Sequence, residues 1–159
     1  MKPKLKLQVE YEGLRETFEG DIDEVFKALL RLLYRIYPQL EIASKLIWTP
    51  DLKHLTEKLP EYCKLTPEGD FIIVKPLPSA EQSILLILTL AYLSYKLEKR
   101  DEESVESREI AKAVNKAEKT VRNTLTELTK SNAVERVDKG RYRITSYGLK
   151  KVEEILMEE

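Results

Sequence analysis

Apolar and polar residues alternate near the start of the chain, and a helical spacing follows. Residues 5–11 place an apolar side chain at every second position, the pattern of a half-buried strand. Glu12-Gly13 can turn the chain, so residues 14–18 are predicted to return as the second strand of a hairpin. Asp21 and Glu24 have the spacing of a capping box, which predicts that a helix with an apolar stripe begins there.

Shorter elements are predicted between this helix and residue 76. Residues 40–46 and 51–59 each favour a helix, and a second hairpin is predicted over residues 64–74 because Pro and Gly lie at its centre. We therefore predict an N-terminal α+β domain over residues 1–76. With about seventy residues it is close to the lower limit for an independent core. We expect it to pack against a second copy of itself, another partner or the helix that follows.

The second half of the chain begins with a helix that is apolar on nearly every face. Ser79 and Gln82 have the capping-box spacing, and the helix is predicted to run to about Lys99. Its segment 84–93 is apolar almost all round, which indicates burial between other elements. This run is about half of the roughly twenty residues that cross a bilayer, so no membrane partner is expected.

Two further helices are predicted after a polar connector. The first begins near Ser107, and Asn115 is expected to cap the second, over residues 116–131. The apolar positions of the second helix share one face: Val121, Leu125 and Leu128. The same geometry turns its polar side chains outward.

Two short strands are predicted next, at residues 133–137 and 141–144, around the turn Asp138-Lys139-Gly140. Alternation directs Tyr142 and Ile144 towards the core and the two arginines of that strand to the other side.

The chain is predicted to end in a helix capped by Thr145, with an apolar stripe over residues 149–156 that has no predicted partner. We take the stripe as a second reason to expect a homodimer, beside the small N-terminal domain. The predicted C-terminal domain spans residues 79–159, and the predicted fold class is α+β.

Positive charge is concentrated in this second half, although the whole chain has a formal net charge of −1. Residues 107–151 carry twelve Lys or Arg and five Asp or Glu, a local net charge of +7. Acidic residues on either side of the segment conceal this in the total. A local positive charge attracts a polyanion such as nucleic acid.

Four short segments, in this order, carry a resemblance to a known class: REIAKAV, KTVRNTLTEL, NAVERV and YRITSYG. Through them, residues 80–158 resemble the winged helix-turn-helix domains of MarR-, ArsR- and PadR-like prokaryotic or archaeal regulators. The resemblance implies that helix 116–131 enters the DNA major groove and that wing 138–143 contacts the backbone or minor groove. Asn132 stands at a position where such domains usually have Gly, and Asn tolerates the left-handed turn needed there.

This interpretation gives ten candidate DNA-binding side chains. They are Arg108, Lys116, Lys119, Thr120, Arg122, Asn123, Thr126, Lys139, Arg141 and Arg143. The expected partner is double-stranded DNA, because a major groove is about as wide as a helix and helix N-termini attract phosphate. A homodimer would place two recognition helices about one duplex turn apart.

The chain offers little for catalysis, metal binding or a cofactor. It has one His, one Cys and five Gly, and no nucleophile grouping, phosphate loop or pair of catalytic carboxylates stands out. Cys63 is expected to be a small buried hydrophobe. No convergent polar set indicates a small-molecule ligand.

Abundant Lys and Glu fit a thermophile, and the absence of a basic-then-apolar leader predicts a cytoplasmic protein.

The sequence therefore predicts a non-enzymatic, sequence-specific DNA-binding protein, most readily a transcriptional regulator acting as a homodimer. The alternative is a winged helix that docks a protein, as an adaptor in a replication, transcription or membrane-remodelling assembly, without binding DNA.

Overall fold

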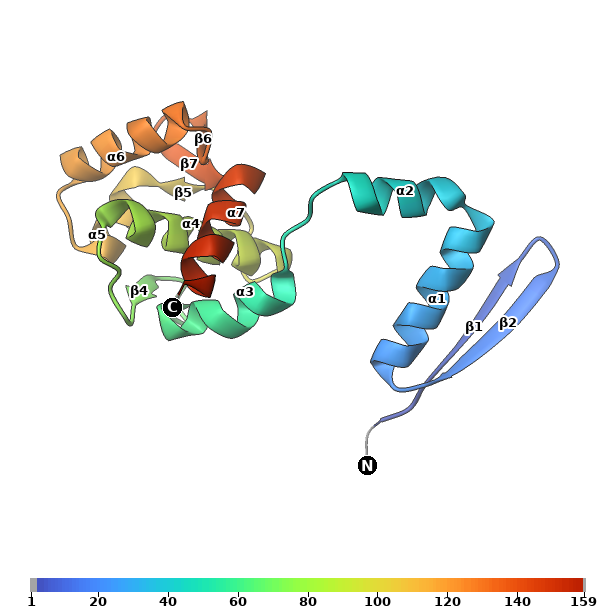
Figure 1. Ribbon diagram of the computed structural model, residues 1–159. Helices are drawn as coiled ribbons and strands as arrows, with labels where there is room; N and C mark the ends of the chain where they lie inside the picture. Colours follow the sequence, from blue (N-terminus) through green and yellow to red (C-terminus); the bar gives the residue numbers. More distant parts are fainter. Residues whose placement is uncertain (1–2, 159) are drawn as a thin grey trace. The chain divides into compact units, whose positions relative to one another are not determined.

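The computed structural model describes residues 3–158, which form two compact units (Figure 1). The first unit extends to Trp48 and the second begins at Thr49. Among the described residues, no helix combines the length and the apolar character that crossing a membrane requires.

The first unit contains the predicted hairpin. Strands β1 (Leu5–Tyr11) and β2 (Leu14–Gly20) pair antiparallel over their full lengths. Glu12 and Gly13 form the turn, both with positive φ. The register gathers the apolar side chains on one face and leaves polar residues opposite one another on the other.

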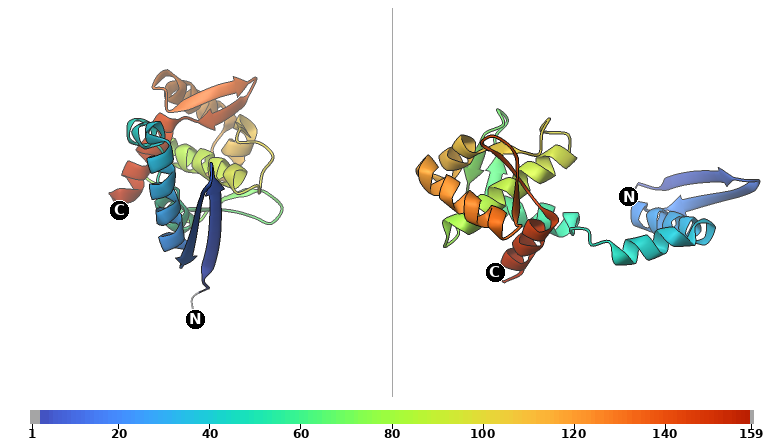
Figure 2. Two further views of the ribbon diagram at one scale, coloured as in Figure 1. Left: turned by 90° about the vertical axis from the view of Figure 1, so that its right-hand side faces the viewer. Right: turned by 90° about the horizontal axis from the view of Figure 1, so that it is seen from above.

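Two helices complete the first unit. Helix α1 (Ile22–Ile36) begins at a capping box in which Asp21 accepts from the Glu24 N–H and Glu24 accepts from the Asp21 N–H, as predicted. It lies along the hairpin (Figures 1 and 2). Helix α2 (Pro38–Leu46) follows, with proline at its first position. Val25 and Leu32 are the only fully buried apolar residues among residues 3–48, so this unit has a very small core of its own.

The second unit is built around helix α4 (Ala80–Lys96), which is buried on nearly every face, as its composition predicts (Figure 1). Helix α3 (Leu52–Lys58), the 3-10 turn η1 (Leu59–Glu61) and the hairpin of β3 (Cys63–Leu65) and β4 (Phe71–Ile73) precede it.

The division between the units lies almost thirty residues before the boundary that the sequence predicts. The pattern assigns residues 49–76 to the N-terminal domain, because Pro76 and Pro78 mark its end. In the structure, Leu55, Leu59 and Phe71 are buried in the same core as α4. Packing against the long helix removes these apolar side chains from water.

The remaining elements form a winged helix-turn-helix, which confirms the predicted fold class. Helices α5 (Ser107–Val114) and α6 (Glu118–Lys130) are followed by β6 (Val134–Asp138), β7 (Arg141–Ile144) and α7 (Ser146–Met157). A further short strand, β5 (Val105–Glu106), pairs with β7, so the sheet has the order β5-β7-β6. This edge strand was not predicted, because two residues are too few for a periodic signal.

Two asparagines end the helices of the motif. The prediction that Asn115 caps the second helix is wrong. Asn115 instead ends α5, in the left-handed conformation at φ 54°. Ala117 stands at the N-terminus of α6 without a side-chain cap. Asn132, at φ 63°, takes the left-handed turn after α6, as predicted. The Ala133 N–H then reaches back to the Leu128 carbonyl, which closes the helix end.

The apolar stripe of α7 is not left over, contrary to the prediction. Leu149, Val152 and Leu156 are all buried in the core, where α7 packs on α4. This stripe therefore gives no support to a dimer interface.

Gly148, the last residue of the YRITSYG segment, allows α7 to approach the strand before it. A Cβ at this position would overlap the Ala133 carbonyl oxygen and lie 2.6 Å from Ile144 Cγ1. We expect Gly148→Ala to lower the free energy of unfolding by about 1–3 kcal/mol, the usual cost of overpacking. Urea unfolding of this variant beside Ser146→Ala, on the exposed first turn of the same helix, measures the effect. Equal midpoints would contradict the close packing.

Candidate nucleic-acid interface

A groove of 530 Å³ lies where helix α6, the start of α5 and the β6–β7 wing meet. Four cationic side chains line it: Arg108, Arg122, Arg136 and Lys139. Two carboxylates, Glu106 and Glu118, also line it. The excess of positive charge, on two helices and a wing, is suited to an anionic polymer.

Backbone and side-chain hydrogen bonds hold these elements together. The Ser107 N–H, at the start of α5, donates to the Gly140 carbonyl of the wing turn at 2.8 Å. The Arg122 guanidinium donates to Glu118 at 2.6 Å and, more weakly, to Ser107 Oγ at 3.5 Å. These contacts fix both the wing turn and the guanidinium of α6 against the start of α5.

The outward face of α6 is as the sequence predicts. Val121, Leu125 and Leu128 are buried, whereas Lys119, Thr120, Arg122, Asn123 and Thr126 are exposed. Of these five, Arg122 and Thr126 line the groove.

The other predicted residues of the helix-turn-helix lie outside the groove lining. Lys119 and Thr120 are exposed on the first turn of α6, and Lys116 is exposed in the turn before it. Asn123 borders a separate hollow with Glu81 and Glu127. The two carboxylates make that hollow less suited to phosphate than the groove.

Arg141 and Arg143 are held by carboxylates and do not line the groove. Arg141 pairs with Glu102 at 2.6 Å and with Glu106 at 3.0 Å, and its side chain is only 27% exposed. Arg143 pairs across the hairpin with Glu135 at 2.9 Å. That hydrogen bond raises the pKa of Arg143 above its ordinary value. The predicted alternation is confirmed, since Tyr142 and Ile144 are buried.

Arg136 is the groove cation that the sequence prediction omitted. It lies opposite Tyr142 in the β6–β7 register, and Tyr142 also lines the groove. The signal was available in the period-2 pattern of residues 134–138, which places Arg136 on the face of Val134 and not of Glu135. Four of the ten predicted residues are therefore brought together with one further cation: Arg108, Arg122, Thr126 and Lys139 join Arg136.

Elsewhere, the described residues show no grouping of three or more His, Cys, Asp or Glu side chains that could hold a metal ion. Cys63 is buried, and burial raises the pKa of its thiol to about 12. The thiol is therefore protonated at neutral pH, as expected for a small core residue.

The helix-turn-helix, the wing and the cationic groove together define a winged helix-turn-helix of the DNA-binding class. Residues 78–155 match the family described as winged helix-turn-helix transcription repressor, HrcA DNA-binding. The match supports a DNA-binding transcriptional regulator, while the finer likeness to MarR-, ArsR- and PadR-like proteins is not confirmed by it. No curated protein matches the chain. Residues 49–77, which lie before the matched segment, belong to the same compact unit.

Proposed function

We propose that the chain is a non-enzymatic regulator that recognises a specific DNA sequence as a homodimer, within the broad prokaryotic or archaeal regulator type. Helix α6 would enter the major groove and the wing would follow the backbone or minor groove. The observation that carries the proposal is the groove between α6 and the wing, which gathers four cationic side chains.

Two kinds of cation in the groove suggest two kinds of DNA contact. Among the described residues, neither Arg108 nor Lys139 forms an ion pair, so each can approach a phosphate without first breaking one. Arg122 is oriented by Glu118 on the outward face of α6, and a planar guanidinium held in place suits bidentate recognition of guanine. We infer that Arg122 reads a base, whereas Arg108 and Lys139 bind the backbone.

Arg141 supports a different interpretation from the one its sequence position suggests. Its guanidinium also donates to the Ser104 side chain and carbonyl, both at 3.1 Å, beside the two ion pairs. These bonds attach the wing strand β7 to the loop before β5. We infer that Arg141 sets the position of the wing, with direct DNA contact secondary.

The homodimer proposal rests on the first unit alone. Ile22 and Phe26 are 62% and 57% exposed, and Leu29 and Leu33 continue the same side of α1 at half-buried positions. Spacings of four, three and four residues are those of a helix-pairing seam. A second copy is the self-complementary occupant of such a seam, and a two-fold axis would present two α6 helices to a near-palindrome.

Lys139→Ala tests the backbone role of the wing. We expect it to weaken binding to all duplex sequences alike and to reduce the slope of log K against log salt by about 1, because one phosphate contact is lost. Fluorescence anisotropy over a salt series measures both. Lys64→Ala, a charge-matched change at the exposed position of β3, should leave the slope at the wild-type value. If duplex binding by the unaltered chain does not depend on salt, the alternative function, a winged helix that docks a protein, would be favoured instead.

A further inference from the structure

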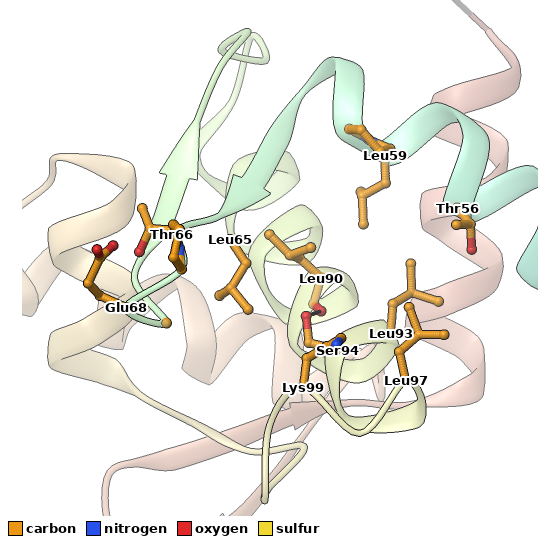
Figure 3. A pocket seen from close by; sticks show the side chains of 13 residues that line it. Thr56, Leu59, Leu65, Thr66, Glu68, Leu90, Leu93, Ser94, Leu97 and Lys99 are labelled. Carbon is orange, nitrogen blue, oxygen red and sulfur yellow. Dashed lines mark hydrogen bonds between the residues drawn. The ribbon is translucent and has the colours of Figure 1, made fainter.

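A second cavity, of 560 Å³, lies in the second unit away from the cationic groove. Three segments enclose it: the α3–η1 stretch, the turn of the β3–β4 hairpin and the C-terminal end of α4 (Figure 3). Five of the thirteen lining residues are leucines: Leu59, Leu65, Leu90, Leu93 and Leu97. The volume is within the range of small-molecule sites, about 300–1,000 Å³.

The polar residues of this cavity lining lie on all three segments: Thr56 on α3, Thr66 and Glu68 on the hairpin turn, and Ser94 and Lys99 at the end of α4. The Ser94 hydroxyl donates to the Leu90 carbonyl at 2.7 Å, whereas Lys99 lies just beyond the end of α4, near Leu97 (Figure 3). Lys99 is exposed, and within the described residues no carboxylate pairs with its ammonium. Glu68, on the hairpin turn, points away from the leucine wall (Figure 3). A ligand with an apolar body and one anionic group at its end would complement this arrangement.

The end of the cavity that holds Lys99 is joined to the DNA-binding elements by one short loop. Next to Lys99, Arg100 pairs with Glu109 of α5 at 3.3 Å, and its guanidinium lies 4.9 Å from the centre of the Phe71 ring. With a side chain only 16% exposed, Arg100 is a fixed link between the loop and the helix-turn-helix.

The same loop also holds the wing. Two of its residues, Glu102 and Ser104, accept hydrogen bonds from Arg141 of β7. A displacement of Lys99 would therefore reach both α5 and the wing through a few residues of chain.

We propose that this cavity is an effector site for an amphipathic monocarboxylate, with its alkyl body among the leucines and its carboxylate on Lys99. The bound acid draws the Lys99 loop towards the cavity and strains the Arg100–Glu109 and Arg141 contacts, which weakens DNA binding. The regulatory part of this inference rests on the proposed DNA-binding function, whereas the binding part does not.

Isothermal titration of the full chain with decanoate, kept below its micelle concentration, tests the binding part without DNA. We expect saturable binding at one site per chain and about fivefold weaker binding of decanol, which has the same body without the charge. Lys99→Gln should weaken decanoate binding by about fivefold, the upper end of the range for an exposed charge pair. The charge-matched control Lys64→Gln should leave it unchanged.

A second variant tests whether decanoate binds in this cavity. Thr56 is an exposed residue of the cavity lining, so Thr56→Trp can block the cavity without entering the core, and it should abolish decanoate binding. Unchanged binding of decanoate to the Thr56→Trp variant, or equal affinities of the chain for decanoate and decanol, would contradict the proposed binding site.

The regulatory part is then measured by anisotropy with a duplex that the unliganded chain binds. Saturating decanoate should raise the DNA Kd severalfold in the wild type and leave it unchanged in Thr56→Trp. Decanoate binding with an unaltered DNA Kd would overturn the effector role alone. Failure of the unliganded chain to bind any duplex would instead contradict the proposed function and leave the titration result standing.

Discussion

Replacing Arg122 with alanine is expected to weaken binding of the preferred duplex by about 1–3 kcal/mol and to relax the sequence preference at one position of the site. The guanidinium lies on the outward face of α6, held by Glu118 at 2.6 Å. Its side chain is 59% exposed, so its removal leaves no buried group unpaired and should not alter the fold. The measurement is anisotropy with the selected duplex and with single-base variants of it.

Lys130→Ala is the matched control for this variant. Lys130 lies in the last turn of the same helix, is exposed, and also has a carboxylate partner, Glu127. The Lys130→Ala variant therefore loses one charge and one surface ion pair, as Arg122→Ala does, but at a residue that does not line the groove. If the Arg122→Ala protein retains both its affinity for the duplex and its sequence preference, the inference that Arg122 of α6 reads a base is wrong.

Phe26→Asp is expected to convert the proposed dimer into monomers. A symmetric interface contains the change twice, and each copy loses at most about 1.5–3 kcal/mol of apolar burial because Phe26 is 57% exposed in the single chain, so the dimer should be weakened by up to about 3–6 kcal/mol. Sedimentation velocity at tens of micromolar measures the state of the chain. The same variant should bind a two-half-site duplex far more weakly while keeping its affinity for a single half-site.

Lys27→Asp controls for the introduced carboxylate at the neighbouring exposed position of α1, off the apolar seam. It should remain dimeric. A wild-type chain that sediments as a monomer would contradict the homodimer proposal directly, and a Phe26→Asp chain that remains dimeric would locate the interface elsewhere.

Much of the local structure follows from the sequence because local signals decide it. The Asp21–Glu24 capping box, the alternation around Tyr142 and the buried face of α6 all depend on residues a few positions apart. The division between the units does not. It depends on whether Leu55 and Phe71 pack against α1 or α4, a contact across the sequence that periodicity does not encode.

The candidate site shows the same limit. Pattern and charge identified Arg108, Arg122 and Lys139, because each lies at a helix start, on an outward helix face or in a turn. They did not distinguish Arg141, which is held by Glu102 and Glu106, from a free cation. The partner residues lie more than thirty positions away in the sequence, so only the fold reveals the pairing.

The central claim is that the groove between α6 and the wing receives duplex DNA. Backbone amide NMR spectra of the full chain, recorded during titration with a duplex selected by the chain from random oligonucleotides, test it most directly. The account predicts that the largest shifts fall on the groove residues of α5, α6 and the wing turn, with Arg122, Arg136 and Lys139 among them. Shifts confined to α7 or to the first unit, or no shifts with any duplex at low salt, would contradict it.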